Sequence, residues 1–208
     1  MAVSSWQPLL TFWFGDLRDG FADDAHRQRW FDGSAEVDDA LRAAFPELPQ
    51  RAAAGELDHW LDDPEGLVCF VLACDQLPRN LYRGSERAFA TDALALAVAR
   101  RAVDDRIDLG LGYDARAFLY LPFEHSEAPS DQHASVGLFS RLRDDTPPGR
   151  RHLTGAYLKY AQQHRDIVLR FGRFPHRNAL LGRPSSAAEL EYLKSATTFG
   201  QGAGSADH

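Results

Sequence analysis

Apolar residues recur at helical spacing along most of the chain. The clearest stretch is 152–171, where apolar side chains repeat at steps of three and four residues, and charged residues such as Arg165 and Arg170 fall between them. This spacing places one apolar stripe along a helix of about five turns. No segment alternates apolar and polar residues over the length of a strand, so the pattern predicts an all-α fold.

The same pattern and its end signals predict further helices. Stretches that are apolar on most sides or rich in alanine predict three long helices, at 65–76, 85–105 and 114–125. Pro122 is expected to kink or end the last of these. Ser186 and Glu189 form an S-x-x-E capping box, which begins a final helix at about residue 187. Shorter helices are expected at 5–14, 35–45, 50–62 and 130–143, giving roughly eight to ten helices in all.

The organisation of the chain follows from its loops and its composition. No linker divides it, so residues 1–199 are expected to form one domain and the Gly-rich residues 200–208 a flexible tail. A chain of 208 residues can bury a core without metals or disulfides. Cys69 and Cys74 stand five apart in an apolar run, which predicts two small buried side chains.

Charge and missing motifs exclude several classes of function. The net charge of −7 disfavours nucleic acids and anionic membranes as partners. No run approaches the roughly 20 apolar residues that span a bilayer, and the start lacks the basic region of a secretory signal, so a cytoplasmic location is expected. Phosphate-binding glycine loops, dinucleotide fingerprints and zinc-protease motifs are absent from the sequence, so we expect no cofactor and no metal.

Two stretches share the same order of residue types. Residues 76–84 read Gln-Leu-Pro-Arg-Asn-Leu-Tyr-Arg-Gly, and residues 173–182 read Arg-Phe-Pro-His-Arg-Asn-Ala-Leu-Leu-Gly. We call them the first and second Pro-Arg-Asn motifs, the second having one inserted residue, His176. Each follows an apolar helix, and each proline is expected to end that helix because the residue before a proline avoids the α region. Repeated helix–loop–helix units indicate stacked helical hairpins.

Five ordered motifs resemble one known family. They are FWFG at 12–15, DQLPRN at 75–80 with YRG at 82–84, FLYLP at 118–122, EHSE at 124–127 and FGRFPHRN at 171–178. Their order is similar to that in the bacterial family called domain of unknown function 924, over roughly residues 8–199. The resemblance implies a tetratricopeptide-like stack of helices, but no activity, since the family has no established catalytic or binding residues. Where the family usually has an acidic residue after EHSE, this chain has Ala128-Pro129.

The two Pro-Arg-Asn motifs carry the first candidate chemistry. Arginine offers a planar fork of donors suited to carboxylate or phosphate, and asparagine both donates and accepts. One interpretation is therefore an anion pocket. The other is structural, because cations are favoured at helix C-termini and asparagine often satisfies loop backbone. The candidate ligand-binding residues of the motifs are Arg79, Asn80, Arg83, Arg173, His176, Arg177 and Asn178.

The second candidate is the segment 124–127. A histidine beside carboxylates can be a tuned general base, so Glu124 and His125 are candidate catalytic residues. Glu124 and Glu127, three residues apart, are expected to share one helical face and to face the pocket. Metal ligation is weakened because adjacent side chains diverge on a helix. A buried network with the arginines is the structural alternative.

Two further polar residues stand in apolar surroundings. Asp75 ends the most apolar helix, where a carboxylate opposes the helix dipole, so we expect a cationic partner in Arg79 or in an arginine of the second motif. Asp75 also joins the candidate ligand-binding set. His164 lies in the apolar stripe of 152–171, either as a hydrogen-bonded core residue or against Glu124 or Asp75.

Three functions stay open on the sequence. The first is binding of a small anionic metabolite, a peptide terminus or an acidic peptide between the two motifs. The second is an enzyme that uses the same pocket, with His125 or Glu124 as general base and Arg79 or Arg177 stabilising negative charge. The third is a helical scaffold for protein–protein interaction, on fold analogy alone. The sequence gives no oligomeric state.

Overall fold

The computed structural model describes residues 5–30 and 34–195, and all regular structure in these ranges is helical. The α-helices are α1 (Gln7–Phe14), α2 (Asp24–Arg29), α3 (Ala35–Ala44), α4 (Leu48–Ala53), α5 (Pro64–Leu81), α6 (Asp92–Asp104), α7 (Tyr113–His125), α8 (Pro129–Asp145), α9 (Arg151–Phe171) and α10 (Ala187–Leu193). Short 3-10 helices are η1 (Asp58–Asp62), η2 (Glu86–Phe89), η3 (Ile107–Gly110), η4 (Pro148–Arg150) and η5 (Pro175–Arg177). The all-α prediction is confirmed.

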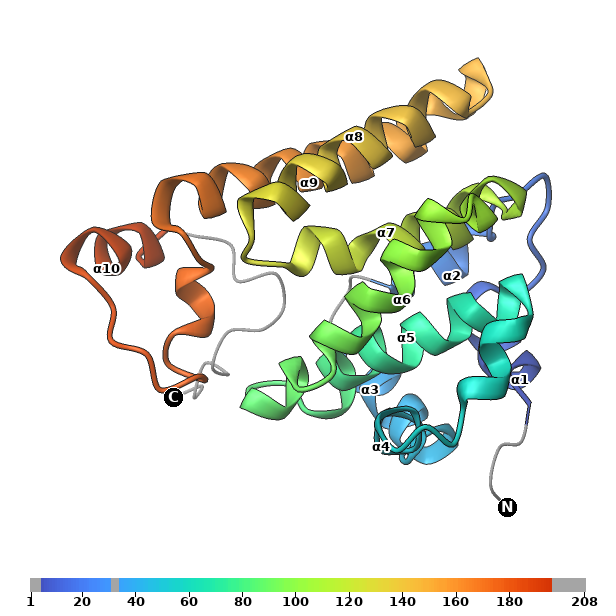
Figure 1. Ribbon diagram of the computed structural model, residues 1–208, viewed down its shortest axis with the longest axis horizontal. Coiled ribbons are helices and arrows are strands. Elements are labelled where there is room, and N and C mark those ends of the chain that lie inside the picture. The colour runs from blue at the N-terminus through green and yellow to red at the C-terminus, as the bar shows by residue number, and fades with distance from the viewer. Residues whose placement is uncertain (1–4, 31–33, 196–208) are drawn as a thin grey trace.

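Helix α5 runs through the centre of the molecule. It contacts α1, α3, α4, α6 and α7, while α8 and α9 form a long antiparallel pair that packs on α7 (Figure 1). Consecutive helices contact each other from α5 to α9, as in a series of helical hairpins. The finer expectation, a tetratricopeptide-like stack, stays a prediction. No helix in the described ranges combines the length and apolarity needed to cross a membrane.

The beginning of α5 shows why this segment is helical. The Asp63 side chain accepts hydrogen bonds from the backbone N–H groups of Glu65 and Gly66, and Pro64 occupies the first turn, where no donor is needed. Every residue from Gly66 to Asn80 is buried. A helix that is apolar on most sides is stable only inside a core, and one connected core indeed extends from α1 to α9. Cys69 and Cys74 lie in it as free, buried thiols, as predicted.

The prediction that each motif proline ends its helix is wrong. Pro78 lies inside α5, which continues to Leu81. A proline leaves the carbonyl four residues earlier without its helical donor, and here the Thr91 hydroxyl donates to the Cys74 carbonyl oxygen at 2.5 Å. Helix α9 ends at Phe171, before its proline, because Gly172 adopts a left-handed conformation and donates its N–H to Val168.

Three other sequence predictions need correction. Of the two outcomes expected at Pro122, a kink or an end, the end is wrong: Pro122 lies inside α7, where every residue from Asp114 to Glu124 is buried. The single helix expected at 85–105 is divided into η2 and α6, and the one at 50–62 into α4 and η1, with Gly55 at positive φ between them. Helix α2 was not predicted, because it has no apolar stripe. Its polar cap, Asp23, was the one local signal of its start. The remaining predicted helices, including the capping box of α10, are confirmed.

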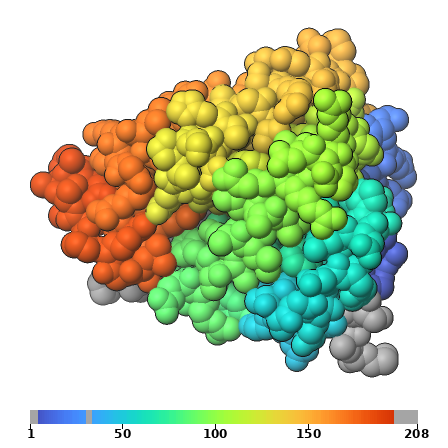
Figure 2. Space-filling model, in the orientation of Figure 1, coloured from blue at the N-terminus to red at the C-terminus, as the bar shows by residue number. Residues whose placement is uncertain are grey.

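The C-terminal segment lies at one end of the molecule. After α9 the chain turns back, and α10 lies at the outer edge, below the end of α9 (Figure 1). The space-filling view shows the C-terminal segment beside the beginning of α8 (Figure 2). Ile167, Val168 and Phe174 form a small second core beneath it. Residues 196–208, including the predicted tail at 200–208, lie outside the described residues, and the single domain at 1–199 stays a prediction.

Candidate functional site

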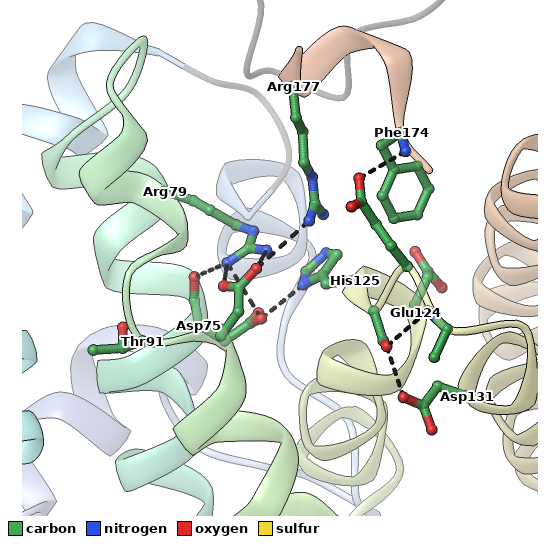
Figure 3. A network of polar contacts seen from close by, with 12 residues as sticks. Asp75, Arg79, Thr91, Glu124, His125, Asp131, Phe174 and Arg177 are labelled. Atoms are coloured by element: carbon green, nitrogen blue, oxygen red, sulfur yellow. Dashed lines mark hydrogen bonds and ion pairs between the residues drawn. The ribbon is translucent and has the colours of Figure 1, made fainter. Parts of the chain in front are cut away.

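A cluster of buried and partly buried polar side chains lies where the C-terminal segment meets the helical core. We call it the polar centre (Figure 3). It consists of Asp75 and Arg79 from α5, Asp92 from α6, Glu124 and His125 from α7, His164 from α9, and Arg177 from η5. The structure therefore brings an arginine from each Pro-Arg-Asn motif together with the EHSE segment.

Asp75 is fully buried at the base of the polar centre. Its Oδ1 lies 2.7 Å from Nδ1 of His125 and 3.3 Å from Nη1 of Arg79, and its Oδ2 accepts from Gln76 at 2.5 Å. Burial alone would raise the pKa of Asp75, but the charge of Arg79 and the interaction with His125 hold this pKa below its ordinary value. The expectation of a cationic partner for Asp75 is confirmed.

Arg79 is saturated with acceptors. Nη1 and Nη2 donate to the two carboxylate oxygens of Asp92 at 2.7 and 2.9 Å, and Nη1 also donates to the backbone carbonyl of Asp75 at 2.8 Å. Burial opposes the charge, but Asp75 and Asp92 raise the pKa of Arg79 above its ordinary value. Arg79 therefore holds α5 and the beginning of α6 together through two carboxylates.

Arg177 approaches the same carboxylate but is poorly compensated. Its Nη1 lies 3.7 Å from Oδ2 of Asp92, and its buried Nε has no hydrogen-bond partner among the described residues. The rings of Phe89 and Phe174 pack on the guanidinium, with centroids 4.8 and 4.5 Å from its central carbon. Burial, and next the like charge of Arg79, lower the pKa of Arg177 to about 10. Arg177 is a buried cation without a full complement of acceptors.

The adjacent residues Glu124 and His125 face different neighbours. His125 meets Asp75, whereas Oε1 of Glu124 lies 3.1 Å from Nδ1 of His164. Nδ1 of His164 also donates to the Tyr160 carbonyl at 2.9 Å, which fixes the proton on that nitrogen. The other Glu124 oxygen, Oε2, is buried without a partner among the described residues.

Burial governs the charge of these three groups. It raises the pKa of Glu124 well above its ordinary value, with a further contribution from the negative charge of Asp75. It lowers the pKa of His125, assisted by Arg79 and opposed by Asp75, and it lowers that of His164 to about 3. At neutral pH the polar centre thus combines neutral histidines with a Glu124 whose ionised form is disfavoured.

The remaining predicted residues of the first motif lie against α3. Asn80 donates to Oδ1 of Asp38 at 2.8 Å, and Arg83 binds both oxygens of the same carboxylate at 2.9 Å. Asp38 was not recognised from the sequence. It lies in the first turn of α3, where an acidic residue is common for capping reasons alone, so its position gave no separate signal.

The remaining predicted residues of the second motif make contacts within the C-terminal segment. Arg173 binds both oxygens of Glu189 at 2.7 and 2.9 Å. Asn178 donates to Ser185 at 3.0 Å and accepts from Arg183 at 3.1 Å. His176 is half-buried against Phe174, and burial lowers its pKa to about 3.

Glu127 does not share a helical face with Glu124, because α7 ends at His125. It accepts from the Phe174 backbone N–H at 2.8 Å and from Arg183, whose Nη1 and Nη2 lie at 2.7 and 3.0 Å. Glu127 therefore fastens the C-terminal segment over the polar centre.

Asp92 was missed because the sequence predicted one helix through 85–105. Recognising Thr91 as a helix start would have placed Asp92 in a first turn.

Two surface pockets are lined by other residues. One, of about 780 Å³, lies around Gly15, His26, Arg27 and Arg150, and the other, of about 450 Å³, lies around Arg100, Phe123 and Arg141. Across the described ranges, no three His, Cys, Asp or Glu side chains are grouped so that they could hold a metal ion.

Known proteins place the chain in a family. The family model described as "Bacterial protein of unknown function (DUF924)" matches residues 9–197. The chain belongs to the DUF924 family. A solved structure of a protein of unknown function from Agrobacterium tumefaciens is 36% identical, with a TM-score of 0.75, and the match covers 92% of this chain and 100% of that one. No curated protein matches. The family and the neighbour confirm the resemblance and the fold, and neither carries an assigned activity.

Proposed function

We propose that this DUF924 protein binds a small anionic ligand at the polar centre, with Arg177 as the main recognition residue. One observation carries the proposal. Arg177 is 7% exposed, its Nε has no hydrogen-bond partner among the described residues, and its ion pair with Asp92 is long, at 3.7 Å. Buried charges are normally paired and hydrogen-bonded, because removing them from water is costly. An anion would supply the missing acceptors.

The arrangement of Arg79 supports this interpretation. Arg79 already occupies both oxygens of Asp92 at hydrogen-bond distance, so Arg177 is left with the weaker contact to one of them. Arg79 and Arg177 then share the Asp92 carboxylate, and the like charge of Arg79 opposes that of Arg177. Binding of an anion at Arg177 would relieve this repulsion, which is a general reason for a functional site to be less stable than its surroundings.

Acid–base chemistry on the bound ligand is the second candidate. It rests on the 2.7 Å contact between Asp75 and Nδ1 of His125. A buried carboxylate that accepts from Nδ1 leaves Nε2 as the basic nitrogen, and the lowered pKa of His125 keeps the ring neutral. Figure 3 shows the His125 and Arg177 side chains on the same side of Asp75, and a ligand held by Arg177 would contact His125 in this second proposal.

A cytoplasmic location is part of the proposal and is supported by two free, buried cysteines.

The test is thermal unfolding with and without phosphate or citrate. In wild type, an anion at 100 times its Kd should stabilise the fold by about 2.7 kcal/mol. Arg177→Gln should leave the ligand-free melting temperature unchanged or slightly higher and should abolish the anion effect. Arg173→Gln is the matched control: it breaks the pair with Glu189, so it should lower the melting temperature but keep the anion effect. No anion effect in wild type, or one that survives Arg177→Gln, would contradict the proposal.

A further inference from the structure

Three of the four arginines in the two Pro-Arg-Asn motifs hold a carboxylate with two nitrogens. Arg79 binds Asp92 at 2.7 and 2.9 Å, Arg83 binds Asp38 at 2.9 and 2.9 Å, and Arg173 binds Glu189 at 2.7 and 2.9 Å. Such two-point pairs fix both the position and the plane of the carboxylate. Arg177 is the fourth arginine, and no described carboxylate occupies two of its nitrogens.

Arg177 leaves without a partner a nitrogen, Nε, that Arg83 and Arg173 use to bind their carboxylates. Arg83 and Arg173 bind through Nε and Nη2, which form one edge of the guanidinium. In Arg177 the contact to Asp92 is made by Nη1, and Nε has no partner among the described residues. Phe89 and Phe174 pack against the guanidinium, so polar contacts are left to its edges. Nε is therefore the donor left for an acceptor that lies in the plane of the guanidinium.

The charges around Arg177 favour an anion with a single charge. Asp92, Glu127 and Asp75 all lie near enough to act on the pKa of Arg177. A second negative charge on the ligand would add repulsion with these carboxylates without gaining another buried cation, because Arg79 is already paired with Asp75 and Asp92. A phosphate dianion is therefore disfavoured relative to a carboxylate.

We infer that the ligand carries a carboxylate, which Arg177 binds through Nε and Nη2 as Arg83 and Arg173 bind Asp38 and Glu189. This inference rests on the proposed anion site and adds the chemical class of the ligand. The carboxylate belongs either to a small organic acid or to the C-terminus of a peptide. Both present the same planar group to Arg177, and they differ in whether a chain follows it.

The test compares ligands at constant ionic strength by thermal shift and calorimetry. The probes are propionate, a trialanine peptide with a free C-terminus, the same peptide amidated, and inorganic phosphate. We expect propionate or the free peptide to bind at least about tenfold more tightly than phosphate, because a second negative charge on the ligand would be repelled by Asp92, Glu127 and Asp75. Binding of the free peptide but neither propionate nor the amidated peptide identifies a peptide terminus. Binding of propionate but neither peptide identifies a small acid.

Arg177→Lys separates the fork from the charge. It keeps a cation but loses the planar pair of donors, so carboxylate binding should weaken at least about tenfold. Arg173→Lys is the control and should leave carboxylate binding unchanged. In wild type, the ¹⁵N–¹H resonance of Arg177 Nε should also shift on titration with the bound carboxylate, which needs no variant to fold. Equal binding of phosphate, or full binding by Arg177→Lys, would overturn the carboxylate inference and leave the anion site standing. No effect of any anion would remove both.

Discussion

The two Pro-Arg-Asn motifs share the order Pro, Arg, Asn and Gly but have different structures. The first forms the last turns of α5, with Pro78 inside the helix. The second follows Gly172 and forms the short helix η5, with Pro175 at its beginning. The arginines that follow the two prolines nevertheless meet at one carboxylate, Asp92, which Arg79 binds with two nitrogens and Arg177 approaches with one.

The difference between these two arginines lies in their surroundings. Each guanidinium is about equally buried, but Asp75 and Asp92 raise the pKa of Arg79, whereas burial and the charge of Arg79 lower that of Arg177. The charge of the first motif holds helices together. The second motif places a similar charge beside the first without compensating it. Similar sequences therefore yield one structural cation and one that is available to a ligand.

The largest expected effect is the loss of Arg79. Arg79→Gln removes the guanidinium that pairs with both Asp75 and Asp92, and breaking a buried ion pair on one side costs about 3–5 kcal/mol of unfolding free energy. The pKa of His125 should rise, because the charge of Arg79 contributes to lowering it. Urea denaturation measures the stability, and NMR titration measures His125.

Arg177→Gln in the same denaturation assay sharpens the contrast between the motifs. Its unfolding free energy should be close to that of wild type or above it, because the substitution removes one long ion pair together with a like charge beside Arg79. Similar large losses in both variants would mean that Arg177 is also structural, and the distinction between the motifs would disappear.

An effect smaller than that of Arg79→Gln is expected from the hydrogen bond that keeps the first motif helical. Thr91→Val removes the hydroxyl that donates to the Cys74 carbonyl, leaving a buried acceptor without a donor at a cost of about 1–3 kcal/mol. In a Pro78→Ala background the same substitution should cost less, because the introduced alanine has a backbone N–H that can donate to Cys74. A double-mutant cycle by urea denaturation measures this coupling. Equal costs in the two backgrounds would show that Thr91 does not compensate for the proline.

Much of the fold could be predicted because helical periodicity reflects burial directly. The stripe at 152–171 is α9, and the apolar run at 65–76 lies within α5. Errors occurred where tertiary contacts override local preference. Pro78 is tolerated because Thr91, thirteen residues later, supplies the missing donor. Such a compensation joins two elements, so the local pattern cannot show it.

The sequence could predict which residues meet in the polar centre, but not which partner each side chain contacts. Arg79, Arg177 and the EHSE segment were expected close together, and Arg79, His125 and Arg177 do meet in the polar centre. Asn80 and Arg83 contact Asp38 instead, because a helical first motif sends neighbouring side chains in different directions. Whether the other nominated residues bind a ligand stays a prediction. A partner such as Asp38 is visible only after the helices pack.

The smallest expected change in stability is that of Glu124→Gln, and this change should depend on pH. Glu124 faces His164 on the side of the second motif. Because the folded pKa of Glu124 is raised, the native state binds more protons than the unfolded state above pH 4.5. The contribution of this group to stability is therefore present below its unfolded pKa and is lost as pH rises towards its folded pKa. Glu124→Gln imitates the protonated acid and should match wild type at pH 5 but exceed its stability at pH 8.

Glu127→Gln is a control of opposite sign. The folded pKa of Glu127 is lowered, chiefly by Arg183 and the Phe174 N–H against the effect of burial, so its contribution is present at pH 8 and lost on acidification. Urea midpoints at the two pH values measure both differences, in which the shared histidine titrations cancel. If Glu124→Gln is instead less stable than wild type at pH 8, as Glu127→Gln should be, then Glu124 is a satisfied anion like Glu127, and the polar centre is better compensated on that side than its geometry indicates.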